Sequence, residues 1–335
     1  MLRAALVITT ACFFLAACGV SHGPVSGGTL RQLQSQAVTV GEARSMLRGD
    51  RFDTRSSPPG PTLRIPMRRD HAGLPHVDAS INGRSPTRLL FDTGATVTVL
   101  SADLAMRSDL ATVPGAKPQM QGVIGKEAGM GGVIERLQIG DWRLENLPCV
   151  IRLQRSSGGI DYLGQDFDIS VLGFHLAQKY CSYITFDYPR GEIELGFGQR
   201  FSGPRLAKHV KSSYKLQQGV PMTRLTTGKV SWDAIVDTGS AFGVEIDQKL
   251  AARLGHATGG TAVDAPFVMI GVGGTTTPRE AGVRIITVPG LRMLGHEFKK
   301  AQLDVMPGMP RIGSFFLKDF RVTFDIRRQL IWLEW

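Results

Sequence analysis

Short runs of alternating apolar and polar residues, separated by glycine-rich turns, recur along the chain from about residue 62. The run Val77–Ile81 alternates with a period of two, and the pair Asn82-Gly83 that follows it is typical of a two-residue hairpin turn. The chain of 335 residues contains 40 glycines and 18 prolines, which favour tight turns. These patterns predict a mainly β fold.

Two segments of the chain carry the same succession of predicted elements. In each, a strand leads into an Asp-Thr-Gly triplet, Asp92–Gly94 in the first and Asp237–Gly239 in the second, 145 residues apart (237 minus 92). A second strand and a short helix follow each triplet, and Ser101 and Asp247 are placed to cap these helices. We therefore expect one structural unit used twice, with an N-terminal lobe over 62–200 and a C-terminal lobe over 201–335.

Each copy continues with a glycine-rich stretch, which we interpret as the tip of a hairpin. A phosphate-binding loop is the weaker interpretation, because neither stretch has a Gly-x-x-x-x-Gly-Lys-Ser/Thr pattern or opens a helix. The residues assigned to these tips are Gly122, Ile124, Gly125, Ile270, Gly271, Gly273 and Gly274. Each copy then closes with an apolar residue before glycine, at Leu172-Gly173 and Ile312-Gly313, and with two strands. These strands are expected at 183–187, 192–195, 321–325 and 330–333.

The first residues resemble a bacterial lipoprotein signal. A short apolar run ends in Leu15-Ala16-Ala17-Cys18, and the resemblance implies that residues 1–17 are removed and that Cys18 is lipidated. A plain secretory signal peptide is the alternative. The resemblance implies a lipid-anchored, extracytoplasmic protein, and Gly19 after the cysteine favours the periplasmic face of an outer membrane if the host has one. Residues 18–61 are expected to form a flexible tether, with a short helix near 40–47.

The duplicated segments resemble the aspartic peptidases, particularly the retropepsin-like group. The resemblance rests on Asp-Thr-Gly-Ala/Ser after an apolar strand, on the Met269–Gly274 flap sequence and on the apolar-Gly pairs. It implies a bilobal pepsin/retropepsin-like fold in which two pseudo-symmetric closed barrels face each other across a cleft. It also implies that one chain supplies both aspartates, Asp92 and Asp237, as an internal pseudo-dimer and hence a monomer. The sequence departs from the family at position 311, where Arg replaces the usual apolar residue.

Two carboxyls that share a proton can hydrolyse an amide without metal or cofactor, so neither is expected. The ionised carboxyl takes a proton from the attacking water, and the neutral one hydrogen-bonds the carbonyl oxygen. Which aspartate is ionised stays open, because the pair titrates as a unit. The resemblance implies that Thr93 and Thr238 interlock across the lobes, while Gly94 and Gly239 allow close approach.

The residues after the two triplets differ, since Ala95 cannot hydrogen-bond a dyad carboxylate and Ser240 can. We expect this asymmetry to raise the pKa values of the dyad and to give an acidic to weakly acidic optimum. The expected substrate is an extended polypeptide that pairs with the flaps.

The formal net charge of +10 fits either a solvated basic surface, which we favour, or attraction to an anionic envelope polymer, and no nucleic-acid module is present. Cys149 and Cys181 are either a disulfide or two buried free thiols. Asp161, Asp166 and Asp168 fit no calcium loop. The sequence thus predicts an aspartic endopeptidase, of general or regulatory type, and the alternative is a non-catalytic peptide-binding lipoprotein on the same scaffold.

Overall fold

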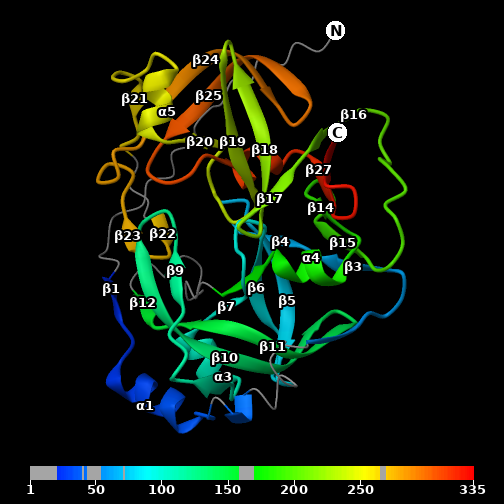
Figure 1. The fold of residues 1–335 in the computed structure, drawn as a ribbon, viewed down its shortest axis with the longest axis vertical. Coiled ribbons are helices and arrows are strands. Elements are labelled where there is room, and N and C mark those ends of the chain that lie inside the picture. Colours follow the sequence, from blue (N-terminus) through cyan, green and yellow to red (C-terminus); the bar gives the residue numbers. More distant parts are fainter. Residues whose placement is uncertain (1–20, 40, 44–53, 71, 158–169, 265–268) are drawn as a thin grey trace.

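The computed structural model is mainly β, with short helices beside the strands (Figure 1). It describes residues 21–39, 41–43, 54–70, 72–157, 170–264 and 269–335. The predicted signal segment 1–17, Cys18 and the acidic residues Asp161, Asp166 and Asp168 lie outside the described residues. Within these ranges, no helix has the length and apolar character needed to cross a lipid bilayer.

Six strands of the first lobe pair in a ring and form a closed barrel. Around the ring they are β5 (Pro75–Ile81), β6 (Thr87–Asp92), β13 (Val171–Gly173), β7 (Val99–Ser101), β11 (Trp142–Arg152) and β10 (Lys126–Ile139). The long strand β10 closes the ring because it pairs with both β11 and β5. Strand β13 runs parallel to β6, which places Gly173 beside Asp92.

The second lobe repeats this ring in the same order. Its strands are β18 (Val220–Thr227), β19 (Val230–Asp237), β26 (Arg311–Gly313), β20 (Val244–Ile246), β25 (His296–Val305) and β24 (Arg284–Met293). Here β24 closes the ring by pairing with β25 and with β18, and β26 runs parallel to β19. The predicted mainly β fold with two pseudo-symmetric closed barrels is confirmed.

The local signals in the sequence account for much of this framework. Asn82 and Gly83 have φ of 49° and 74° and form a tight turn closed by the Arg84 N–H to the Ile81 carbonyl, but the connection from β5 to β6 covers residues 82–86 and not two residues. The Ser101 hydroxyl accepts a hydrogen bond from a backbone N–H at 3.1 Å, and the Asp247 carboxylate accepts one at 2.7 Å. They cap the helices α3 (Ala102–Arg107) and α5 (Gln248–Arg253).

The remaining elements lie at the edges of the barrels or between them. They are β1 (Ser21–Pro24), α1 (Gly27–Ser35), β2 (Arg55–Ser57), β4 (Arg68–Arg69), β8 (Ala111–Val113), β9 (Gln119–Gln121), β12 (Gln154–Ser157), α4 (His175–Tyr180), β17 (Lys215–Gln217), β21 (Thr261–Ala262), β22 (Met269–Gly271), β23 (Gly274–Thr276) and α6 (Ser314–Leu317).

A six-stranded sheet joins the two lobes, and each lobe contributes three of its strands. Its order is β16 (His209–Ser213), β28 (Leu330–Glu334), β27 (Arg321–Asp325), β14 (Tyr183–Asp187), β15 (Glu192–Gly196) and β3 (Thr62–Pro66). The central strands β14 and β27 are antiparallel, and equivalent residues of the two copies, Thr185 and Thr323, lie opposite each other with their hydroxyls 2.8 Å apart. The pseudo-twofold relation of the lobes therefore passes through this pair.

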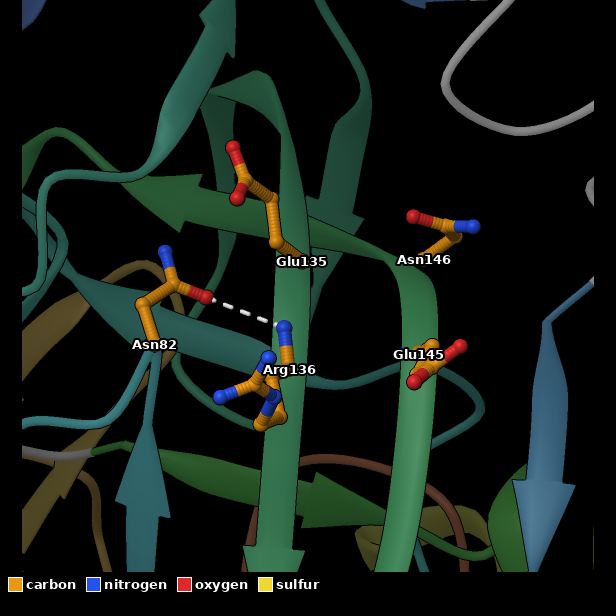
Figure 2. Close-up of a pocket in the computed structure, with 5 residues that line it drawn as sticks. All are labelled: Asn82, Glu135, Arg136, Glu145 and Asn146. Atoms are coloured by element: carbon orange, nitrogen blue, oxygen red, sulfur yellow. Dashed lines mark hydrogen bonds between the residues drawn. The ribbon is translucent and has the colours of Figure 1, made fainter.

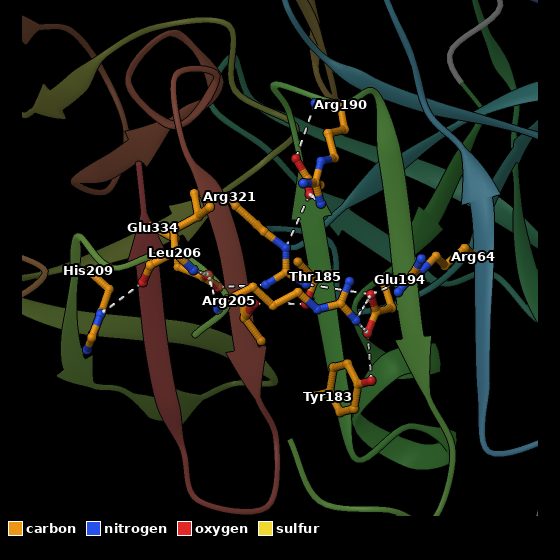
Figure 3. Close-up of polar contacts among 12 residues, drawn as sticks. Arg64, Tyr183, Thr185, Arg190, Glu194, Arg205, Leu206, His209, Arg321 and Glu334 are labelled. Carbon is orange, nitrogen blue, oxygen red and sulfur yellow. Dashed lines mark hydrogen bonds and ion pairs between the residues drawn. The ribbon is translucent and has the colours of Figure 1, made fainter. Parts of the chain in front are cut away.

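Charged side chains cross the lobe boundary on one face of this sheet (Figure 3). Arg321, which is 2% exposed, lies 2.6 Å from a fully buried carboxylate oxygen of Glu334 and 3.6 Å from Glu194. Its Nε lies 3.2 Å from Asp187 but without hydrogen-bond alignment, so that contact is one of charge alone. Buried charges of this kind depend on their partners, because an unpaired charge away from water is costly.

The segment expected to be a flexible tether is fastened to the first lobe over much of its described length. Leu33 on α1 has no exposed surface, and its carbonyl accepts a hydrogen bond of 2.7 Å from the Thr112 hydroxyl. The Val25 N–H donates to the Leu153 carbonyl, and β1 pairs with β12. Figure 1 shows α1 lying against the first lobe beside α3. The segment docks through an apolar face of α1 that includes Leu33. The Ser- and Gly-rich residues at its beginning do not predict this contact.

Cys149 and Cys181 are both buried and are not joined. Of the two interpretations left open by the sequence, a disulfide is therefore wrong and two buried free thiols describe the structure. Burial raises the pKa of Cys149 and of Cys181 to about 12, so neither thiol ionises readily at neutral pH.

We predict that Arg321→Ala lowers the free energy of unfolding by about 3–5 kcal/mol, because it leaves the fully buried Glu334 without its cation. Urea denaturation of parent and variant measures the difference. Arg292→Ala is the matched control, since its ion pair with Glu297 is largely exposed and should be worth less than about 1 kcal/mol. Equal losses in the two variants would contradict the prediction.

Candidate active site

Each predicted site aspartate ends a strand and lies beside a glycine of a parallel strand. Asp92 is opposite Gly173, and Asp237 is opposite Gly313. A Cβ on Gly173 would lie 2.5 Å from the Val97 carbonyl oxygen, and one on Gly313 would overlap the Phe242 carbonyl. The chain that leaves each Asp-Thr-Gly triplet thus folds back over a glycine, which explains why the apolar-Gly pair accompanies the triplet in both copies.

The two threonines of the triplets bind each other across the lobe boundary. The N–H of Thr93 donates to the Thr238 hydroxyl at 3.0 Å, and the N–H of Thr238 donates to the Thr93 hydroxyl at 3.0 Å. Each hydroxyl then donates to a carbonyl of the opposite strand, Thr93 to Val236 at 2.5 Å and Thr238 to Phe91 at 2.7 Å. Both side chains are fully buried, so these four hydrogen bonds set the separation of the two loops.

The loops bring the two carboxyls together. A Cβ on Gly94 would lie 2.5 Å from the carboxyl carbon of Asp237, and one on Gly239 would overlap the carboxyl of Asp92. The N–H of Gly94 donates to Asp92 Oδ1 at 2.6 Å, and that of Gly239 donates to Asp237 Oδ1 at 2.9 Å. Each carboxyl therefore rests on the glycine of the partner loop, where any side chain would displace it.

The environment of the pair favours one retained proton. Asp92 is half-buried and Asp237 buried. Burial raises the pKa of Asp92 well above its usual value, and the negative charge of Asp237 and a hydrogen bond between the two carboxyls act in the same direction. The Gly94 N–H and the Arg311 guanidinium lower this pKa, but they do not outweigh the other causes.

The polar surroundings of Asp237 differ from those expected. The Ser240 hydroxyl donates to Glu245 Oε1, whereas Arg311 Nε lies 3.0 Å from Asp237 Oδ2. Ala95 instead borders an apolar cluster in the first lobe. Position 311 stands out in the sequence as a departure from the family, but its contact with the dyad does not follow from that departure.

The two predicted flap tips meet each other. Residues 122–125 connect β9 to β10, and Val272 and Gly273 connect β22 to β23. A Cβ on Gly122 would lie 2.7 Å from that of Val272, and one on Gly125 would lie 3.5 Å from Gly273 Cα. Each tip packs against the opposite lobe. Val272 contacts the first-lobe cluster that includes Ala95, and Val123 contacts a second-lobe cluster that includes Phe242.

A buried ion pair that sequence reasoning missed fastens the second flap to the first lobe. The guanidinium of Arg152 donates to Glu127 at 2.7 and 3.0 Å, and both side chains are buried. Arg152 also donates to the Gly271 carbonyl at 2.7 Å, and the Gly273 N–H donates to Glu127 at 3.0 Å. The alternation along the strands is consistent with Glu127 and Arg152 pointing inward, but it does not show what they bind. The backbone groups of Gly271 and Gly273 that they bind lie more than a hundred residues away in the chain.

A second set of hydrogen bonds that sequence reasoning missed holds the Asp237 loop in place. The Ser314 hydroxyl donates to the Thr238 carbonyl at 2.8 Å, and the hydroxyl of the fully buried Tyr188 lies 3.1 Å from that of Ser314. Tyr188 comes from the first lobe, so this chain of contacts fixes the second-lobe loop from across the boundary.

A separate hollow lies on the first lobe at the β5–β6 turn and the β10–β11 hairpin, lined by Asn82, Glu135, Arg136, Glu145 and Asn146 (Figure 2). None of the predicted site residues lines it. Across the described part of the chain, no three His, Cys, Asp or Glu side chains are grouped so that they could hold a metal ion.

Comparison with known proteins bears on the first lobe. Residues 77–174 match the family model described as aspartyl protease, a segment that contains Asp92 and Gly173. No curated protein matches the chain. Solved structures that match include the crystal structure of a retropepsin-like aspartic protease from Rickettsia conorii, at 17% identity and a TM-score of 0.28, over 43% of this chain and 94% of that chain.

We predict that the stability gained on replacing Asp92 by Asn increases with pH. A carboxyl whose folded pKa is raised binds its proton more tightly when folded, so the parent is most stable below the unfolded pKa of about 3.9 and loses stability as pH rises through the folded pKa. Asn cannot ionise and escapes that loss. Melting temperatures of parent and variant from about pH 4 to about pH 8 measure the difference.

Asp233→Asn serves as the control of opposite sign, because a hydrogen bond from Arg224 lowers the pKa of this exposed carboxyl. The parent's advantage from Asp233 is present above the unfolded pKa and lost as pH falls through the folded pKa. A difference between the Asp92→Asn variant and the parent that stays flat with pH would refute the assignment of a retained proton.

Proposed function

We propose that the chain, whose first lobe matches the aspartyl protease family model over residues 77–174, is an aspartic endopeptidase with Asp92 and Asp237 as its catalytic dyad. The main support for the proposal is that each carboxyl contacts the glycine of the other triplet, Asp237 at Gly94 and Asp92 at Gly239. A hydrogen bond between the carboxyls and the raised pKa of Asp92 support it, because one shared proton is what the chemistry requires.

Peptide hydrolysis by such a pair needs only water. The ionised carboxyl accepts a proton from the water as its oxygen attacks the peptide carbonyl carbon, and the protonated carboxyl donates a hydrogen bond to the carbonyl oxygen. The tetrahedral intermediate collapses when the carboxyl that accepted the water proton passes it to the peptide nitrogen and the carbon–nitrogen bond breaks, which releases the amine and the new carboxyl group. The pair is suited to this exchange, since the raised pKa of Asp92 keeps a proton available under acidic to weakly acidic conditions.

The flaps support an extended polypeptide as the substrate. A peptide between the dyad and the flap tips would pair its backbone with strand edges and present alternate side chains to the two lobes. Val123 and Val272 occupy apolar clusters next to the dyad loops, so binding would first part the flaps. The Glu127–Arg152 contacts with the second flap would resist this opening.

We predict that Asp92→Asn and Asp237→Asn each lower kcat/KM for peptide cleavage by about 100-fold or more, since each removes one of the two proton-transfer groups. Asn keeps the shape of Asp, so the loops should stay in place. Purified full-length protein is incubated with a peptide library digested from a bacterial proteome, and mass spectrometry identifies new termini. Pepstatin provides an independent inhibitor of dyad chemistry.

Asp233→Asn is the matched control, because this exposed aspartate lies on the same strand as Asp237 and pairs with Arg224 at the surface. It should cleave like the parent. Cleavage by both dyad variants at the parent's rate would refute the proposal. Peptide binding without cleavage by the parent would favour a non-catalytic peptide-binding lipoprotein instead.

We also propose that the protein is an extracytoplasmic lipoprotein anchored through Cys18. Its support is the sequence Leu15-Ala16-Ala17-Cys18, and the docked segment from Ser21 to Val38 would then hold the first lobe close to the lipid. Cys18→Ser should abolish incorporation of radiolabelled palmitate and move the protein from the membrane fraction to the soluble fraction, while Cys12→Ser should change neither. Unchanged labelling of the Cys18→Ser variant would contradict the anchor.

A further inference from the structure

The surroundings of the two dyad loops differ at three equivalent positions. Gly173 and Gly313 correspond, so Val171 in the first lobe is the counterpart of Arg311 in the second, each two residues before its glycine. Across the neighbouring strand pair, Val171 faces Val99 and Arg311 faces Glu245.

The third position directly follows each triplet, where Ala95 corresponds to Ser240. The trio of Ala95, Val99 and Val171 belongs to one apolar cluster, whereas Ser240, Glu245 and Arg311 form one polar cluster. Glu245 alone would be a buried carboxylate without a cation, and Arg311 and Ser240 bind its two oxygens, so the three together constitute one unit.

The contacts of this cluster run from the dyad inward. Arg311 Nε lies 3.0 Å from Asp237 Oδ2, and its Nη1 lies 3.4 Å from Glu245 Oε2. The Ser240 hydroxyl donates to the other oxygen of Glu245. Arg311 is 9% exposed and Glu245 is 1% exposed, and a Cβ on Gly308 would lie 3.2 Å from the guanidinium, so the preceding loop also packs over it.

We propose that Arg311 is a positioning residue that keeps Asp237 the ionised member of the dyad and leaves the proton on Asp92, with Glu245 and Ser240 holding the guanidinium in place. The inference rests on the proposed peptidase function and adds an assignment of roles, Asp237 as base and Asp92 as acid. A cation in contact with one carboxylate of a pair stabilises the charge on that carboxylate, and the shared proton then resides on the other.

The charge of Glu245, the carboxylate that binds Arg311, itself depends on pH. Burial raises the pKa of Glu245 to about 7, the charges of Asp237 and Asp304 act in the same direction, and Arg311 and the Ser240 hydroxyl oppose them. Burial also raises the pKa of Asp304 to about 6. Under acidic conditions Glu245 and Asp304 both carry protons, and the charge of Arg311 is then balanced by Asp237 alone.

One further titratable group lies near the dyad, on the side of the first lobe. It is Tyr188, whose pKa burial raises and the charges of Asp237 and Asp92 raise further, while the charge of Arg69 opposes them. Tyr188 stays neutral through the acidic and neutral range, so it does not change the assignment as pH changes.

The test rebuilds the apolar trio of the first lobe in the second, as the variant Ser240→Ala/Glu245→Val/Arg311→Val. Carbon-13 NMR of the Asp92 and Asp237 carboxyls follows their ionisation in parent and variant. Loss of the cation should raise the pH of the first ionisation of the pair by about one to three units. The acidic limb of the kcat/KM profile should move upward with it, while Arg311→Lys, which keeps the charge, should titrate close to the parent.

Arg311→Gln/Glu245→Gln provides a second neutral cluster that keeps polar contacts, in case the apolar variant does not fold. Ionisation of the pair at the parent's pH in a folded neutral variant overturns the inference, as does a Lys variant that shifts as far as the neutral ones. The NMR result stands apart from catalysis. A shift in a protein that cleaves no peptide would uphold the role of Arg311 and refute the peptidase function.

Discussion

Two carboxyls in contact repel each other unless they share a proton, and bringing them together is the constraint around which this structure is built. The four Thr93 and Thr238 hydrogen bonds hold the loops at a fixed separation, and Gly94 and Gly239 leave room for the carboxyls. Neither lobe can make this arrangement alone. The inter-lobe sheet is therefore part of the site, because its Thr185–Thr323 pair and the buried charges of Arg321 fix how the lobes face each other.

The strand framework of the two lobes is symmetric, but the side chains around the two aspartates are not. The first lobe surrounds its loop with apolar side chains, while the second supplies Arg311 and Glu245. The flaps show the same division, since the ion pair of Glu127 and Arg152 in the first lobe binds the backbone of the second flap. A single chain permits this because its two halves can diverge, whereas two identical chains would place the same charge on both sides of the dyad.

Local patterns in the sequence predicted the barrel strands well. The alternation in β5, the left-handed Asn82-Gly83 turn and the caps at Ser101 and Asp247 each depend on neighbours within a few residues. The expectation for the segment after Cys18 was less successful, because composition alone does not reveal that Leu33 finds a buried position on the first lobe. The two cysteines raised the same difficulty, since spacing gives no distance between their sulfur atoms.

Local sequence patterns are sufficient to predict the repeated unit and the two aspartates that it presents, because a strand period, a turn and a triplet are properties of short segments. The groups that surround those aspartates come from distant segments and are not predicted by such local patterns. Arg311 is a mere departure from a pattern until folding places it 3.0 Å from Asp237, 74 residues earlier in the chain (311 minus 237). Charges and hydrogen bonds act through space, so the partners of a buried side chain are fixed by the packing of distant segments.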